Sequence, residues 1–416
     1  MTSWKTYKIV DLCKISSSKR IFAKEYKDSG IPFYRGKEII EKQKGNKIST
    51  ELYISQERYD EIKAKHGVPQ KGDMLLTSVG TLGIPYIVQD EVFYFKDGNL
   101  TWFYNFEGLD SRYLYYWFLS PIGKMNIDSK AIGSTQKALT IETLSKFEIS
   151  LPSLEEQRRI AGILGAIDDK IENNRRINDN LEQQAQALYK QWFVDFNFPN
   201  EEGKPYKSSG GKMIDSELGP IPEGWRVQTI SDISVRIASG GTPKSLNESY
   251  YNGEIKWFTT KELKDCFLID SDKHISMEAL NDSAAKLFPK NTILMAIYAA
   301  PTVGRLGILT AESTFNQAAV GIVAKEEIGH LFVYLTLLAE RENLNNLASG
   351  AAQQNLNVGI VKQYKLIVPT KKLLIEFNQI AGSLFERIKV VSNENKTLAT
   401  LRDTLLPKLM NGEIKL

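Results

Sequence analysis

Basic and hydroxyl-bearing side chains lie on loops beside short apolar runs at two places in the chain. In the first half they are Arg35, Lys37, Thr77, Ser78, Thr81 and Lys96. In the second half they are Thr259, Thr260, Lys261, Tyr298 and Arg305. Arginine and lysine can donate to O6 and N7 of guanine, and threonine and serine can bond to bases or phosphates. The sets are therefore candidate DNA contacts, and a solvated surface residue is the alternative interpretation for each member.

A polar run that follows Gly133 offers a second kind of contact, because its backbone amides could surround a phosphate. A plain turn before a strand is the alternative, and the residues do not decide between the two. The run has a counterpart after Gly350, where Gln353 matches Gln136. The candidate contacts in the two runs are Ser134, Gln136, Lys137, Gln353 and Gln354.

Catalytic motifs are missing from the sequence. Adenine methylation would call for an Asn-Pro-Pro-Phe-like tetrapeptide, and a phosphate-binding loop for G-x-x-x-x-G-K-[ST]; neither occurs. The three histidines, His66, His274 and His330, lack metal-ligand spacing. The tripeptide Glu-Ile-Lys recurs, but without the Pro-Asp partner that a nuclease site would require. We expect no catalytic residue and no metal site.

Composition sets the remaining limits. The 416 residues suggest two to four domains, and 42% hydrophobic with 25% charged residues is ordinary for a soluble globular protein. A net charge of +3 permits DNA binding without indicating it. No apolar run reaches the ~18 residues of a membrane span, so no membrane is expected. Two cysteines cannot form a disulfide framework, which favours a cytoplasmic location.

The elements that must position these side chains occur twice. The segment that begins at Trp4 matches the one that begins at Trp225, and Ile31–Ile39 parallels Ile255–Leu263. Pro152, which ends an apolar strand-like run, matches Pro369 in the same way. The period is far too long for a solenoid. The sequence therefore predicts two copies of a whole domain, each with its own connecting segment.

Each copy has two parts. Short strand-like runs punctuated by glycine make up the first part, and helix makes up the second. Ser153 stands three residues before Glu156, which is a capping-box spacing at a helix start. The predicted boundaries are 1–152 for the first domain, 153–195 for a first helical spacer, 196–220 for a Pro-, Gly- and Ser-rich linker, 221–369 for the second domain and 370–416 for a second helical spacer.

Both helical segments carry apolar residues at alternating spacings of three and four, as in a coiled coil. Asn174, Asn178 and Asn395 occupy seam positions, where asparagine fixes register and partner. Each helix is near 40 residues, about 60 Å long, which favours pairing over the alternative of an amphipathic helix on its own domain. The predicted helix-pair residues are Ile167, Ile171, Leu181, Leu188, Ile388, Val391, Leu398 and Leu405.

The predicted fold class is mixed α/β (α+β): two pseudo-symmetric domains separated by two long antiparallel helices that form a coiled-coil spacer. This order resembles the specificity subunit of type I restriction-modification enzymes. The repeated G-x-x-Q…L…(L/V)P boundary, with EQRRIA after the first copy, resembles that family's junction, and Ser216–Trp225 resembles its entry to the second unit. Lys14–Ile39 and Ser239–Leu263 resemble one shared region of it. The resemblance covers essentially the whole chain.

The resemblance implies two target recognition domains, each of which recognises one half of a bipartite site in double-stranded DNA. The helix pair would separate the halves and dock two methyltransferase subunits, and endonuclease subunits that translocate DNA would complete the assembly. The chain itself would bind no cofactor, since S-adenosylmethionine, ATP and Mg would belong to the partner subunits. Two alternatives remain: a stand-alone two-domain DNA-binding protein, and an enzyme that acts alone.

Overall fold

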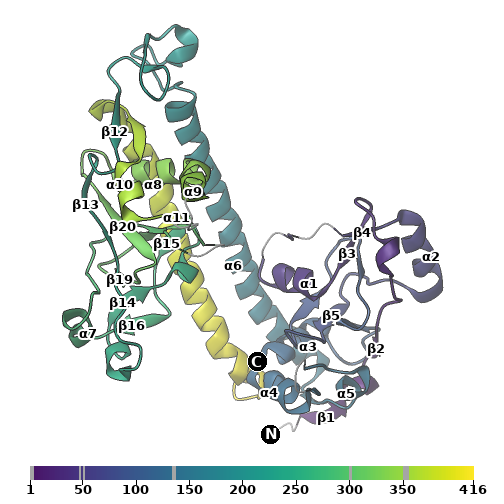
Figure 1. Cartoon of the computed structure of the whole chain (residues 1–416). Helices are drawn as coiled ribbons and strands as arrows, with labels where there is room; N and C mark the ends of the chain where they lie inside the picture. Colours follow the sequence, from purple (N-terminus) through teal and green to yellow (C-terminus); the bar gives the residue numbers. More distant parts are fainter. Residues whose placement is uncertain (1–3, 46–47, 50–51, 134–136, 299–301, 350–355) are drawn as a thin grey trace. The chain divides into compact units, whose positions relative to one another are not determined.

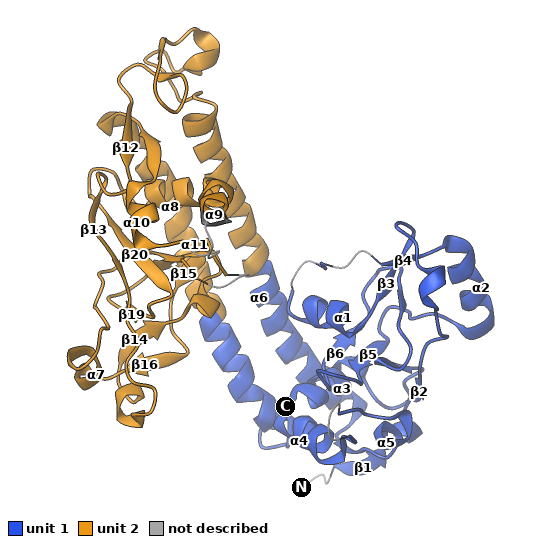
Figure 2. Cartoon of the chain, in the orientation of Figure 1, with its two compact units in different colours: residues 1–173, 396–416 blue, residues 174–395 orange. Residues whose placement is uncertain are grey.

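The computed structural model describes residues 4–45, 48–49, 52–133, 137–298, 302–349 and 356–416. Figure 1 labels the elements in chain order. The chain divides into two compact units, shown in Figure 2. Unit 1 is made of residues 1–173 and 396–416, and unit 2 of residues 174–395. The division cuts both long helices, α6 (Leu154–Tyr189) and α11 (Lys371–Met410), each of which changes colour along its length in Figure 2. Each unit therefore contains one globular part and a segment of both helices.

Unit 1 has three small sheets among its described residues. An antiparallel pair joins β1 (Lys5–Lys8) to β9 (Glu148–Leu151). An antiparallel sheet has the order β2 (Lys14–Ser16), β8 (Leu100–Tyr104), β5 (Met74–Thr77) and β6 (Pro85–Ile87). The third has the order β4 (Tyr53–Ile54), β3 (Ile31–Tyr34) and β7 (Tyr94–Phe95), with β3 and β7 parallel.

Unit 2 repeats these sheets in the same order. Its antiparallel pair is β12 (Arg226–Thr229) with β21 (Lys365–Val368). The larger sheet has the order β13 (Ser234–Ser239), β20 (Ala319–Ala324), β17 (Ile293–Ala296), β18 (Leu306–Leu309) and β15 (Cys266–Leu268). The third has the order β16 (Lys273–Ile275), β14 (Ile255–Phe258) and β19 (Thr314–Phe315). The predicted internal repeat is confirmed, with β15 as an added strand.

The helices and short turns complete the two units. The remaining helices of unit 1 are α1 (Gly36–Gln43), α2 (Gln56–His66), α3 (Ser111–Leu119), α4 (Pro121–Lys130) and α5 (Ile141–Ser145). Those of unit 2 are α7 (Met277–Asn281), α8 (His330–Ala339), α9 (Arg341–Ser349) and α10 (Val358–Gln363). Single turns are Ile9–Asp11, Ala23–Glu25, Lys190–Val194, Lys207–Ser209, Glu248–Tyr251 and Thr260–Glu262, and a short ribbon pairs β10 (Met213–Ile214) with β11 (Ile221–Pro222). Within the described ranges, no helix is long and apolar enough to cross a membrane.

The cores of the two repeats are filled differently although their strand registers agree. Leu75 on β5 stands opposite Trp102, whereas its counterpart Leu294 on β17 stands opposite Gly321. A Cβ on Gly321 would lie 2.6 Å from the Phe315 ring. Glycine is therefore required in unit 2, because a larger side chain in place of Gly321 would clash with the Phe315 ring.

The long helices begin and pair as predicted. The Ser153 hydroxyl accepts a hydrogen bond from the Glu156 backbone N–H (3.2 Å), which is the predicted N-cap. In unit 2, Asn178 donates to the Ser392 hydroxyl (3.0 Å), and further along α6 the Tyr189 ring packs against Phe377. Later residues of α6 thus meet earlier residues of α11, so the two helices run antiparallel.

A predicted seam asparagine connects the two helices in unit 2. Asn174 is fully buried, and its Nδ2 donates to Asn395 Oδ1 (2.9 Å) and Glu394 Oε2 (2.8 Å). A buried amide needs such partners, because an unpaired one costs roughly 1–3 kcal/mol. The register of the helix pair is therefore specified by a polar contact, the role that coiled coils give to asparagine.

Each long helix ends in the core of the unit that is built on the other repeat. Leu406, Leu409 and Met410, near the end of α11, are buried in the core of unit 1. Ala185 and Tyr189, near the end of α6, are buried in the core of unit 2. Because the end of α11 packs into unit 1, the C-terminal segment is a structural part of the first domain. The predicted boundaries assign this segment to the second helical spacer.

The segment between the repeats is packed against unit 2. Phe196, Phe198 and Trp225 are buried in its core. The Phe198 ring stacks on Trp225 and on Tyr206, with centroid distances of 5.2 and 4.6 Å. Residues that connect the repeats therefore also close the core at the end of α6.

Candidate nucleic-acid interface

Arg35 lies between β3 and α1, and Glu38 holds it in place. The Glu38 carboxylate accepts from the Arg35 backbone N–H (2.6 Å) and from its guanidinium Nη2 (2.9 Å) and Nε (3.3 Å). Glu38 is fully buried, so its charge requires this partner. The hydrogen bond that Arg35 donates to Glu38 raises the pKa of Arg35 above its usual range, which keeps the guanidinium charged. The arginine is a fixed cation at the start of α1.

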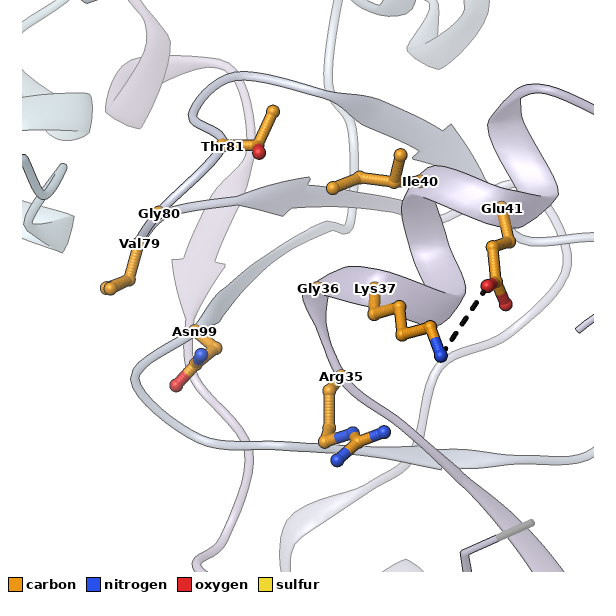
Figure 3. A pocket seen from close by; sticks show the side chains of 9 residues that line it. All are labelled: Arg35, Gly36, Lys37, Ile40, Glu41, Val79, Gly80, Thr81 and Asn99. Carbon is orange, nitrogen blue, oxygen red and sulfur yellow. Dashed lines mark ion pairs between the residues drawn. The ribbon is translucent and has the colours of Figure 1, made fainter. Parts of the chain in front are cut away.

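A cavity of about 600 Å³ opens beside Arg35 (Figure 3). It brings together three of the predicted contacts, Arg35, Lys37 and Thr81. Lys37 is exposed and forms a long ion pair with Glu41 (3.8 Å), which costs little to exchange for another anion. The other lining residues, which the sequence analysis did not identify, are Gly36, Ile40, Glu41, Val79, Gly80 and Asn99.

Thr77 and Ser78 shape the loop that lines the cavity. Both are buried. Thr77 Oγ1 accepts from the Ile84 N–H (2.9 Å), and the Ser78 and Thr101 hydroxyls are bonded to each other (2.6 Å). The exposed side chain of the loop is Thr81 at its tip. Two of the candidates therefore act within the domain, and the third faces outward.

Lys96 and Lys137 lie next to the same region. Lys96 follows β7, and its backbone N–H donates to Tyr34 O (2.8 Å), which places it beside Arg35. Lys137 is exposed and precedes Ala138, which pairs with Val79 of the cavity loop. Ser134, Gln136, Gln353 and Gln354 lie outside the described residues.

The second repeat places Thr259 where the first has Arg35: each comes directly after the last residue of the matching strand, β14 or β3. Glu262 accepts from the Thr259 backbone N–H (2.7 Å) and hydroxyl (2.8 Å). Thr260 is buried, whereas Lys261 is exposed. Tyr298, 39% exposed, and half-buried Arg305 flank the loop after β17. The second candidate surface is thus richer in hydroxyl groups than the first.

The predicted helix-pair residues on α6 and α11 are all buried or partly buried. Leu181 and Leu188 pack against the core of unit 2, which contains Ile388, and Leu405 packs against the core of unit 1. Ile171 and Val391 are buried. Ile167 and Leu398 are partly buried.

Among the residues that the structure describes, no group of three or more histidine, cysteine, aspartate or glutamate side chains could hold a metal ion. Cys13 and Cys266 are free. The chemistry that the surfaces offer is hydrogen bonding and charge.

Glu38 and Glu262 are the functional candidates that the sequence analysis missed. Both follow a lysine in the matched segments Ile31–Ile39 and Ile255–Leu263. The repeated Lys-Glu pair was the available signal, because a capping glutamate three residues after the N-cap is a recognisable pattern.

Comparison with known proteins gives consistent matches. Residues 1–183 and 222–399 match the family model described as "type I restriction modification DNA specificity domain". The chain is 28% identical over 421 residues to the type I restriction enzyme MjaIX specificity subunit of Methanocaldococcus jannaschii, covering 99% of this chain and 94% of that protein. It is 28% identical over 344 residues to the HindI specificity subunit of Haemophilus influenzae, covering 70% and 74%. The S subunit structure from M. genitalium shares the fold, with a TM-score of 0.60, 18% identity and coverage of 98% and 96%.

Proposed function

Because the chain belongs to the type I restriction-modification DNA specificity family, we propose that its two repeats recognise the two halves of a bipartite site in double-stranded DNA. The observation that supports this is the repetition of one architecture with different polar residues at the same place. Two DNA half-sites of different sequence need two readers of similar shape and different chemistry.

The chain is a non-catalytic subunit in this proposal. Two methyltransferase subunits dock on it, and endonuclease subunits that translocate DNA complete the restriction enzyme, in the cytoplasm. S-adenosylmethionine, ATP and Mg are bound by those partners. The antiparallel helices support the proposal, since two equivalent domains present two equivalent surfaces to two copies of one partner.

The direct test is to map DNA methylation in cells that carry the chain and in cells from which it is deleted. We expect a bipartite motif, methylated in both halves, that disappears with the deletion. Purification of the tagged chain should recover a methyltransferase. A bound motif without any co-purified methyltransferase would favour the stand-alone DNA-binding protein, and methylation or cleavage by the purified chain alone would favour an independent enzyme.

The helix pair offers a second test, of spacing. Four residues inserted after Asn173 and four after Asn395 lengthen both helices at the boundary between the compact units and leave both cores intact. Coiled coils absorb insertions of four by local unwinding. The added rise is about 6 Å, and base pairs stack at ~3.4 Å, so the unspecified gap should lengthen by about one or two base pairs. An unchanged gap would contradict a spacer role for the helices.

A further inference from the structure

Each repeat has a glutamate at the equivalent position, and this glutamate accepts hydrogen bonds from the residue three positions before it. In the first repeat, Glu38 accepts from the backbone N–H and the guanidinium of Arg35. In the second repeat, Glu262 accepts from the backbone N–H and the hydroxyl of Thr259. The contact is therefore the same, and only the residue that is held differs.

We propose that Arg35 and Thr259 are equivalent specificity-determining residues for the two half-sites, and that Glu38 and Glu262 are the positioning residues that orient them. The proposal rests on the proposed function and adds to it the residues that distinguish one half-site from the other. The same strand pairing places both: Tyr34 stands beside Phe95 in the first repeat, and Phe258 stands beside Phe315 in the second.

The guanidinium geometry indicates which base the first repeat prefers. Glu38 binds the edge formed by Nε and Nη2. The second donor edge, of Nη1 and Nη2, is the one that can donate to O6 and N7 of guanine together. Because Glu38 is fully buried, it cannot follow a moving arginine, so the direction of that edge is fixed. Arg35 should therefore select guanine at one position of its half-site.

The threonine geometry indicates a different preference in the second repeat. The Thr259 hydroxyl donates its hydrogen to Glu262, so toward any other group the hydroxyl oxygen acts as an acceptor. Adenine N6 and cytosine N4 are the donors that the major groove presents, whereas guanine presents two acceptors there. Thr259 should therefore favour adenine or cytosine at the equivalent position and disfavour guanine.

The test is selection from a randomised duplex library by the full chain assembled with its host methyltransferase subunits. Arg35→Thr should lower the preference for guanine at one position of one half-site by about 5- to 150-fold, the range for one bidentate contact. Arg35→Lys should lower the guanine preference as well, because lysine keeps the positive charge but lacks the two parallel N–H donors of the guanidinium. Thr259→Arg should create a guanine preference in the other half-site, a gain that misfolding cannot produce.

Glu38→Gln tests the positioning role. It should weaken the guanine preference at the Arg35 position and leave the other positions unchanged. Glu262→Gln should weaken the base preference at the Thr259 position in the other half-site. If Glu38→Gln does not fold, Glu262→Gln alone tests the positioning role. The matched controls are Glu61→Gln and Lys65→Thr on the exposed face of α2, which pair with each other and should leave the motif unchanged.

The outcomes separate the two proposals. If the wild-type assembly selects no bipartite motif, the proposed function fails. If it selects one, but Arg35→Thr weakens binding equally for all sequences, then Arg35 contacts phosphate and the inference is overturned. Loss of specificity at several positions with either glutamine variant, in a protein that melts normally, would overturn the positioning role.

Discussion

The two repeats share their backbone and differ in their side chains. Their sheets have the same strand order, and each holds a polar residue on a buried or half-buried glutamate at the same turn. Yet the held residue is Arg35 in one repeat and Thr259 in the other, and the cavity residue Asn99 corresponds to Ala318. Chemistry at the surface has therefore changed while the elements that position it have not.

The interiors differ as much as the surfaces do. Tyr86 and Trp102 flank Leu75 in unit 1, where unit 2 has Gly307 and Gly321. The space beside Gly307 is occupied by Leu268 from the added strand β15, 2.7 Å from a Cβ at that position. Each core is thus packed by its own set of residues, and the domains should be exchangeable as wholes but not residue by residue.

Exchange of a whole domain should have the largest effect. Residues 1–152, together with residues 396–416 that complete the same core, are replaced by the corresponding segments of another family member, with the first cut placed after β9 because β1 pairs with β9. We expect all specified positions of one half-site to change and the other half-site to stay, as mapped by methylation sequencing. A change in both half-sites would show that the repeats do not recognise DNA independently.

Exchange of single core residues should fail. Trp102→Gly removes a buried indole from unit 1 and should lower the free energy of unfolding by about 3–5 kcal/mol, as large-to-small core changes do. Gly321→Trp places a ring against Phe315 and Phe288, which lie 2.6 and 2.9 Å from a Cβ there, and should unfold unit 2. Urea denaturation of both variants is the measurement. Near-native stability of Gly321→Trp would contradict the assignment of distinct cores.

The sequence predicted most of the architecture because the repeat is visible as matched residues. The strands at Met74–Thr77 and Ile293–Ala296, the start of α6 and the seam position of Asn174 follow from local patterns that the structure keeps. The packing of Leu409 in the core of unit 1 was not predictable, because no local pattern reports which distant surface a helix end meets.

The candidate site was predicted only in part for a related reason. Thr77 and Ser78 have the same side-chain chemistry as Thr81, and residue type alone does not tell that the first two are buried at the end of a strand. The buried carboxylate of Glu38 was missed because charged residues are ordinarily exposed. A paired buried charge is the exception that only the three-dimensional contact with Arg35 explains.

The carboxylates that α6 carries have different surroundings in the two units. In unit 1, Asp168 accepts from Arg402 (2.8 Å) and Tyr116 (2.7 Å). In unit 2, burial raises the pKa of Glu182 from 4.5 to about 7, and Asp179 and Asp265 raise it further. The folded state therefore binds this proton more tightly than the unfolded state does.

Stability from Glu182 is thus fully present below about pH 4.5 and is lost as the pH rises through about 7. Wild-type protein should be less stable at pH 8 than at pH 5.5, by up to roughly 2 kcal/mol from this group, and Glu182→Gln should remove that difference. Urea unfolding at both pH values measures it, with exposed Glu155→Gln as the control. Equal pH dependence in wild type and Glu182→Gln would contradict the assignment.

The smallest effect should come from a backbone position that the repeats do share. Gly72 has φ +91°, and its counterpart Asn291 has φ +68°. Both backbone N–H groups make the same contact, with Val88 O (3.0 Å) and Leu309 O (2.8 Å) respectively.

No atom lies within 4 Å of a Cβ built on Gly72, and asparagine tolerates positive φ, so Gly72→Asn should change the free energy of unfolding by less than about 1 kcal/mol. Gly72→Val, which is β-branched, should cost more, on the order of 1–3 kcal/mol of backbone strain. The two variants are compared by urea denaturation. If asparagine costs as much as valine at this position, the turn has a different conformation in the two repeats, and the shared backbone on which the comparison rests does not extend to it.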